Sequence, residues 1–165
     1  MTTFASEILD PLGLAFDSDG DLFAGSLYRA TVSEYTPAGQ HQYFALGVPG
    51  PWGLAFGQDD TLFATSYEVR DNVVFGRILK FLPDGSRTLF FERVGAFNGL
   101  TLDDAGNLYA TGASEIIKIT PEGIDSIYAS GLDSPVALAF ARGIPGPNTT
   151  WLLLGAATIL FIASK

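Results

Sequence analysis

The chain has 165 residues, which is enough for one compact domain, and it is too apolar for a disordered protein at 47% hydrophobic and 16% charged residues. Its net charge of −9 would repel phosphate backbones, so nucleic acid is excluded as an expected partner. Without cysteine and with a single histidine, it can form neither disulfides nor thiolate zinc sites nor a two-histidine metal site.

A repeat of about 40 residues organises the chain. The segments GLAFDSDGDLFAGS from Gly13, GLAFGQDDTLFATS from Gly53 and GLTLDDAGNLYATG from Gly99 align without gaps, and a fourth copy opens at Ala137. This spacing is near the period of about 40 to 45 residues that marks four-stranded propeller blades. Each unit also contains a later Pro-x-Gly turn between apolar runs, so each is predicted to be two hairpins.

The predicted fold is an all-β propeller of four-stranded antiparallel blades, with about three and a half repeats in residues 1–140, either partial or four-bladed. Blade one is predicted at 12–16, 21–25, 31–35 and 42–46. Blade two is predicted at 52–56, 61–65, 76–81 and 87–92, and blade three at 98–102, 107–111, 115–119 and 125–129. A further blade starts near 136. Because closed propellers take about four to eight blades, the length indicates an incomplete ring.

The repeat resembles two related groups of propellers. GLAFDSDGDLFA followed by the Pro-x-Gly turn is similar to the NHL repeats and to the gluconolactonase (SMP-30) family, over residues 3 to about 140. In the latter family the resemblance implies a divalent ion near the central axis, held by Asn and carboxylate side chains. Asn98, in Asn-Gly-Leu, matches one such entry, whereas Leu12, Trp52 and Val136 stand at the corresponding entries and cannot ligate.

The C-terminus carries a second resemblance. Residues 141–150 read as a linker, and 144–150 followed by the uncharged run 151–163 and Lys165 resembles a PEP-CTERM sorting tail, with Gly146 where that family has glutamate. The run predicts a short apolar helix within an anchor segment 151–165, although it is shorter than the span of about 17 to 25 residues that crosses a bilayer. In the alternative, 151–155 and 158–162 are strands B and C of a fourth blade, closed by 3–9.

The tail resemblance implies where the protein works. It implies the cell envelope or exterior of a Gram-negative bacterium, membrane association through the C-terminal segment, and a sorting transpeptidase of the exosortase type as partner. No signal peptide is visible, because MTTFASEILD has no basic region followed by an apolar region.

Loops from the D-to-A and B-to-C connections share one face of a propeller, and function usually lies on such loops. The insertion at about 67–75, in blade two, is the best candidate for specific recognition, the alternative being a surface loop without a role. The acidic turns at 17–21 and 103–106 are predicted as A-to-B turns rather than calcium loops. The predicted binding face comprises Tyr28, Arg29, Trp52, Tyr67, Glu68, Arg70, Asp71, Asn72, Asn98 and Asp133.

The expected function is a non-catalytic recognition module of an exported, envelope-associated protein, which binds a protein or carbohydrate partner on the loop face. No catalytic residue is assigned, because one histidine gives no Ser-His-Asp set by spacing. Two alternatives stay open. One is a divalent-metal-dependent lactone hydrolase, for which calcium is a suitable ion and Asn98 is the single candidate ligand. The other is a gene fragment without independent activity. No other cofactor is expected.

Overall fold

The computed structural model describes residues 8–141 and 159–163. These residues form strands, turns and loops, and no helix occurs among them. Within this part of the chain there is consequently no helix with the length and hydropathy to cross a membrane. The all-β class predicted from the repeat is confirmed.

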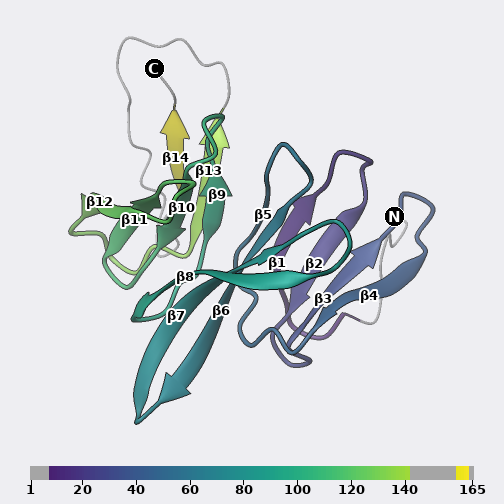
Figure 1. Cartoon of the computed structure of the whole chain (residues 1–165), viewed down its shortest axis with the longest axis horizontal. Coiled ribbons are helices and arrows are strands. Elements are labelled where there is room, and N and C mark those ends of the chain that lie inside the picture. Colours follow the sequence, from purple (N-terminus) through teal and green to yellow (C-terminus); the bar gives the residue numbers. More distant parts are fainter. Residues whose placement is uncertain (1–7, 142–158, 164–165) are drawn as a thin grey trace.

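Three four-stranded antiparallel sheets follow one another in chain order (Figure 1). Blade one consists of β1 (Pro11–Phe16), β2 (Leu22–Ser26), β3 (Thr31–Tyr35) and β4 (His41–Leu46). Blade two consists of β5 (Leu54–Phe56), β6 (Leu62–Arg70), β7 (Val73–Phe81) and β8 (Arg87–Val94). Blade three consists of β9 (Leu100–Leu102), β10 (Leu108–Thr111), β11 (Glu115–Ile119) and β12 (Asp125–Ser130). The innermost strands β1, β5 and β9 contact one another in order, and β13 (Ala137–Ala141) follows β9.

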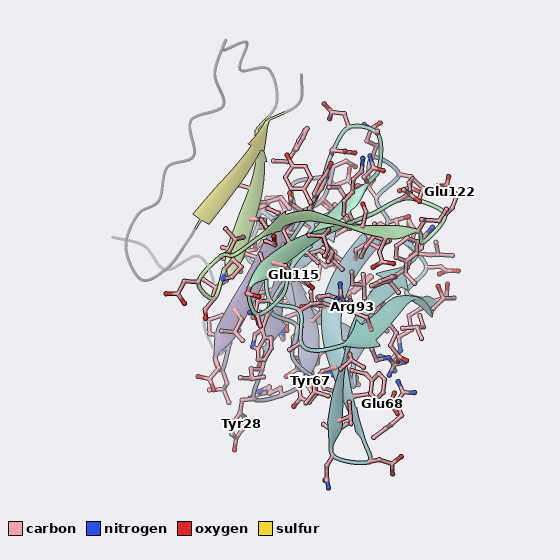
Figure 2. The ribbon with its side chains drawn as sticks, turned by 90° about the vertical axis from the view of Figure 1, so that its left-hand side faces the viewer. Tyr28, Tyr67, Glu68, Arg93, Glu115 and Glu122 are labelled. Atoms are coloured by element: carbon pink, nitrogen blue, oxygen red, sulfur yellow. The ribbon has the colours of Figure 1, made fainter. Side chains whose placement is uncertain are left out.

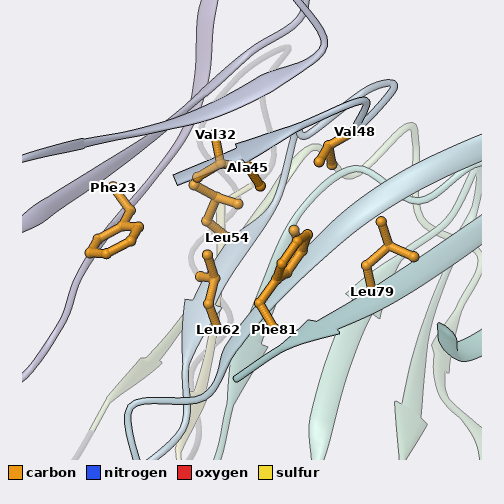
Figure 3. Packing of buried hydrophobic residues seen from close by; sticks show 9 residues of the cluster. Phe23, Val32, Ala45, Val48, Leu54, Leu62, Leu79 and Phe81 are labelled. Atoms are coloured by element: carbon orange, nitrogen blue, oxygen red, sulfur yellow. The ribbon is translucent and has the colours of Figure 1, made fainter. Parts of the chain in front are cut away.

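Neighbouring blades pack through apolar faces whose residues recur with the repeat. Phe23 and Val32 of blade one meet Leu54, Leu62 and Phe81 of blade two in one buried cluster (Figure 3). The rings of Phe23 and Phe56 add an edge-to-face contact, with centroids 4.8 Å apart. Each strand thus presents one set of side chains to the preceding blade and the other set to the following blade, as the two-residue period of a strand requires.

The same arrangement joins blade two to blade three and blade three to β13. Phe63 and Ile78 of blade two are buried with Leu100, Leu108 and Ile117 of blade three. A third cluster contains Tyr109 and Ile116 of blade three, with Leu138 and Phe140 of β13 packed against it. The first strand of the fourth repeat copy, β13, therefore packs against blade three as β9 packs against blade two.

Among the described residues, none covers the innermost strand of blade one on its preceding face. Leu14 is 59% exposed, whereas its repeat equivalents Leu54 and Leu100 are 6% and 5% exposed. Phe16 is 63% exposed, whereas its equivalents Phe56 and Leu102 are partly buried. Both positions are apolar in each copy of the repeat, but the side chains are exposed in blade one and buried or partly buried in blades two and three. Blade one thus carries on β1 two side chains of the kind that fills a blade interface elsewhere in the chain.

The insertion in blade two forms a long hairpin, so the prediction of a loop at 67–75 is wrong. The β6–β7 ladder continues from Tyr67 opposite Gly76 to Arg70 opposite Val73. The turn contains only Asp71 and Asn72, which have φ values of 50° and 61°. Two residues with positive φ form the turn whose twist matches a hairpin, and Asp and Asn tolerate that conformation. In Figure 1 this hairpin projects beyond the neighbouring strands.

The C-terminal predictions fall partly on described residues. Positions 151–158 of the predicted helix lie outside them, and so does most of the sorting tail. At 159–163 the structure has strand β14 (Ile159–Ala163) in place of the helix, consistent with the β-branched and aromatic content of Ile-Leu-Phe-Ile. Because β14 pairs with β13 in parallel, it does not form the neighbouring antiparallel strand that a fourth blade would place beside strand A.

Candidate functional site at the propeller axis

The starts of the four innermost strands converge on one hollow, which we call the axial mouth. It has a volume of about 290 Å³ and is lined by Leu12, Trp52, Asn98 and Val136. These are the four repeat-equivalent entry positions, one from each copy of the motif. A second hollow of about 220 Å³ follows the innermost strands from Leu12, Trp52 and Val136. The structure therefore joins two residues of the predicted binding face, Trp52 and Asn98, at the axis.

Two buried threonines hold the strand entries in place. The backbone N–H of Gly53 donates to Thr65 Oγ1 at 2.8 Å, and the N–H of Gly99 donates to Thr111 Oγ1 at 2.8 Å. Both threonines are fully buried. They fix the residues directly after Trp52 and Asn98, which restricts where those two side chains project. Sequence reasoning missed them, although a threonine follows the motif glycine at the same repeat position in blades two and three.

Trp52 is supported from behind by Tyr67. Their rings stack with centroids 6.3 Å apart and an interplanar angle of 24°. The Tyr67 ring lies against Gly50, where a Cβ would approach Tyr67 Cδ1 to 2.7 Å, and the Tyr67 N–H donates to the Pro49 carbonyl at 3.1 Å. The predicted face residue Tyr67 thus belongs to strand β6, and its role is to support the ring of Trp52.

Asn98 is the hydrogen-bonding side chain of the axial mouth. Its backbone N–H donates to the Thr111 carbonyl at 3.0 Å. Within residues 8–141 no hydrogen bond engages its side-chain amide, which leaves the amide able to donate to or accept from a ligand. The other three lining residues offer apolar or aromatic surface, apart from the indole N–H of Trp52.

The residues of the mouth do not make a divalent-metal site. Calcium takes six to eight oxygen ligands, and among the described lining residues only Asn98 has a side-chain oxygen. Among the described residues no group of three His, Cys, Asp or Glu side chains is placed to hold a metal ion. Asn98 as a lone metal ligand therefore lacks the partners that such a role requires in the described part of the chain.

Two members of the predicted face, Glu68 and Arg70 of β6, form ion pairs with Arg77 of β7 and Glu92 of β8. Arg77 Nη1 lies 3.0 Å from Glu68 Oε2, and Arg70 pairs with Glu92. The Arg70 guanidinium also lies over the Phe75 ring, 4.0 Å from its centroid. These ion pairs stabilise the extended hairpin. Each contributes modestly to the free energy of unfolding, because its side chains are partly exposed. Glu68 and Arg70 are not among the described residues that line the axial mouth.

The remaining predicted residues lie apart from the mouth. Tyr28 and Arg29 are in the turn between β2 and β3, where Tyr28 is 76% exposed and Arg29 Nη1 donates to Tyr43 Oη at 2.6 Å. Asp133 is exposed in the β12–β13 connection. Figure 2 shows Tyr28 and Glu68 toward the end from which the hairpin projects, with Glu122 toward the opposite end. The two-face layout predicted for the loops is visible there.

A hollow of about 300 Å³ lies on the opposite face, between the A-to-B turns of blades two and three. Its carboxylates serve the turns: Asp103 Oδ1 accepts from the N–H groups of Ala105 and Asn107, and Oδ2 accepts from Asn107 Nδ2 and Tyr109 Oη. Burial acts to raise the pKa of Asp103, but these hydrogen bonds outweigh it and hold the pKa below its ordinary value. Because these groups are engaged in structure, the axial mouth is the better candidate site.

Asp103→Asn is expected to lower the free energy of unfolding by about 1–3 kcal/mol near pH 7 and by less near pH 3. The lowered folded pKa means that the carboxylate's contribution is present above the unfolded value of about 3.9 and is lost as the pH falls through the folded pKa. Urea unfolding at both pH values measures the difference. Asp19→Asn, an exposed carboxylate of the equivalent turn, controls for the loss of one charge. An equal loss at both pH values would contradict this account.

No protein-family model and no curated protein sequence matches the chain. Solved structures share its fold. The nidogen/laminin complex matches with a TM-score of 0.70 and 23% identity, over 81% of this chain and 54% of that one. A gluconolactonase from Xanthomonas campestris matches with 0.66 and 20%, over 81% and 52%. Regucalcin, a calcium-binding protein from Agrobacterium tumefaciens, matches with 0.68 and 15%, over 82% and 52%. The chain spans about half the length of each.

These comparisons correct one expectation and confirm another. The prediction of a non-catalytic recognition module is wrong, because the structures that share the fold include a gluconolactonase and regucalcin. At 15–23% identity the likeness establishes the fold. The chain therefore has a β-propeller fold built from four-stranded antiparallel blades, and its resemblance to gluconolactonase-type propellers is confirmed at the level of that fold.

Proposed function

We propose that the chain belongs to a lactone hydrolase and that the lactone binds in the axial mouth. The observation that carries the proposal is the unengaged amide of Asn98, set among apolar side chains at the axis. The shared fold with the gluconolactonase from Xanthomonas campestris supports this reaction class. The chain spans about half of that structure's length, and the proposal assigns the activity to the chain itself.

In this proposal Asn98 positions the reacting carbonyl. Water adds to the lactone carbonyl carbon, the ring C–O bond breaks, and a proton passes to the ring oxygen, so that lactone and water give the hydroxy acid. The Asn98 amide N–H donates to the carbonyl oxygen, where negative charge develops during the addition. The Trp52 ring, supported by Tyr67, orients the lactone, and the threonine-fixed entries limit movement of both groups.

The proposal is tested by following acid release in a pH-stat. The purified full chain is mixed with glucono-δ-lactone and with δ-decalactone, and each rate is compared with hydrolysis in buffer alone. We expect hydrolysis above the buffer rate for at least one lactone, and the heat-unfolded chain should lose it. If the folded chain accelerates neither lactone, the proposed function is wrong.

The sorting tail and its consequences stay proposals that rest on sequence. The envelope location, the membrane association and the exosortase-type partner depend on 144–165, of which only 159–163 are described. Fractionation of cells that express the chain behind a signal peptide tests them. Recovery with membranes, reversed when 151–165 are deleted, is the expected result; a product that is soluble in both cases would count against the anchor.

A further inference from the structure

The axial mouth offers mostly apolar surface to whatever enters it. Three of the four described residues that line it are Leu12, Trp52 and Val136. Leu12 is 45% exposed and Val136 is 47% exposed, so both side chains are available to contact a ligand. A ligand that covers them removes apolar surface from water, at about 25 cal/mol per Å². The lining therefore favours ligands that carry apolar groups.

Trp52 provides a flat platform that is held in position before a ligand arrives. Its ring stacks on Tyr67, and Tyr67 is fixed by the hairpin register opposite Gly76 and by close approach to Gly50. The Gly53 N–H bond to Thr65 restrains the backbone directly after Trp52. A preorganised aromatic ring costs little conformational entropy on binding, and it favours ligands that present a ring face or an alkyl chain.

The described lining of the axial mouth offers few hydrogen-bonding partners to the polar groups of a ligand. Apart from Asn98, the lining side chains supply one further polar group, the indole N–H of Trp52. A lactone carbonyl engages the Asn98 amide, but ring hydroxyls placed against leucine and valine would lose water without gaining a hydrogen bond. Each such hydroxyl weakens binding, because a buried hydroxyl without a hydrogen-bond partner is unfavourable. The lining thus disfavours a polyhydroxylated ring.

We propose that the axial mouth binds lactones whose ring carries an alkyl or aryl substituent, in preference to polyhydroxylated sugar lactones. The ligand class rests on the proposed function; the preference for an apolar substituent rests on the lining itself. A hollow of about 290 Å³ suits a monocyclic lactone. The carbonyl contacts Asn98, the ring stacks on Trp52, and the substituent covers Leu12 and Val136.

Isothermal titration calorimetry of the full chain with two lactams tests this preference, because lactams resist the hydrolysis that would obscure binding heats. The probes are 6-pentylpiperidin-2-one, which matches δ-decalactone, and gluconolactam. We expect the pentyl lactam to bind at least about tenfold more tightly, since burial of its methylene groups removes apolar surface from water. Equal or tighter binding of gluconolactam, or no binding of the pentyl lactam, would overturn the inference.

Substitutions in the lining test whether the lactams bind in the axial mouth. Trp52→Ala should weaken the pentyl lactam by about tenfold or more, while Trp52→Phe, which keeps an aromatic face, should stay within about threefold of the parent. Val136→Ser alters an exposed lining residue and should weaken the pentyl lactam without affecting gluconolactam. Far-UV circular dichroism confirms that each variant is folded. Unchanged affinity in both Trp52→Ala and Val136→Ser would contradict binding at the mouth.

The two proposals fail separately. If the pentyl lactam binds through Trp52 but neither lactone is hydrolysed, the proposed function is wrong and the apolar preference stands. If glucono-δ-lactone is hydrolysed and gluconolactam binds more tightly than the pentyl lactam, the proposed function stands and the apolar preference is wrong.

Discussion

Leu54→Ala is expected to lower the free energy of unfolding by about 2–4 kcal/mol. Leu54 is 6% exposed and lies between blades one and two, in the cluster that contains Phe23 and Phe81. Truncation removes buried methyl groups and leaves a cavity between two sheets that cannot move together without disturbing β1 and β5. Urea unfolding followed by circular dichroism measures the change.

Leu14→Ala is the matched control, because Leu14 holds the same repeat position one blade earlier. Its side chain is 59% exposed, so the expected loss is below about 1 kcal/mol. The pair separates the identity of the residue from its burial. If both substitutions cost the same, the preceding face of blade one is covered in solution as that of blade two is, and the exposure described for Leu14 is wrong.

Gly53→Ala is expected to destabilise the protein by about 1–3 kcal/mol and to disturb the axial mouth. A Cβ at this position would lie 2.6 Å from the Asn98 carbonyl oxygen and 2.8 Å from the Leu100 nitrogen. These are backbone atoms of the neighbouring innermost strand, so they cannot turn aside as a flexible side chain can. Strands β5 and β9 must separate, which moves Trp52 relative to Asn98 and should weaken lactam binding as well.

Gly112→Ala controls for the general effect of adding a methyl group. At Gly112 the nearest atom to a Cβ is Glu115 Cγ at 3.5 Å, which is ordinary van der Waals contact. Replacement is expected to change stability by no more than about 1 kcal/mol, and a gain is possible because the unfolded chain loses freedom. Equal effects at the two glycines would show that close approach of the innermost strands is not what requires Gly53.

Much of the fold was predictable because the information is local and repeated. Strands β3 and β11 coincide with their predicted ranges, since alternating side chains and Pro-x-Gly turns define them in the sequence. The β6–β7 hairpin was misread because an insertion has no repeat partner for alignment. Its signal was nevertheless present in Asp71-Asn72, a turn pair with Val69 two positions before Asp71 and Val73-Val74 directly after Asn72, since valine favours strands.

The candidate site was predictable only in part. Trp52 and Asn98 were identifiable as strand entries that recur with the motif, so the axis brings them together. The stack of Trp52 on Tyr67 depends on the register of a hairpin whose length the sequence left open. The ion pairs of Glu68 and Arg70 could not be predicted, because pairing among four charged side chains depends on contacts between β6, β7 and β8.

The most direct test is the value of kcat/KM for lactone hydrolysis in Asn98→Ala, measured beside the parent chain and Gln40→Ala. Asn98 donates to the developing oxyanion in the proposed reaction, and loss of one such donor costs about 10²–10³ in rate. Gln40 lies exposed in the β3–β4 turn, away from the axial mouth. A fall of about 10² or more in Asn98→Ala, with Gln40→Ala unchanged, is the predicted result. Parent-like hydrolysis by a folded Asn98→Ala chain would contradict the assignment of the axial mouth as the site of lactone hydrolysis.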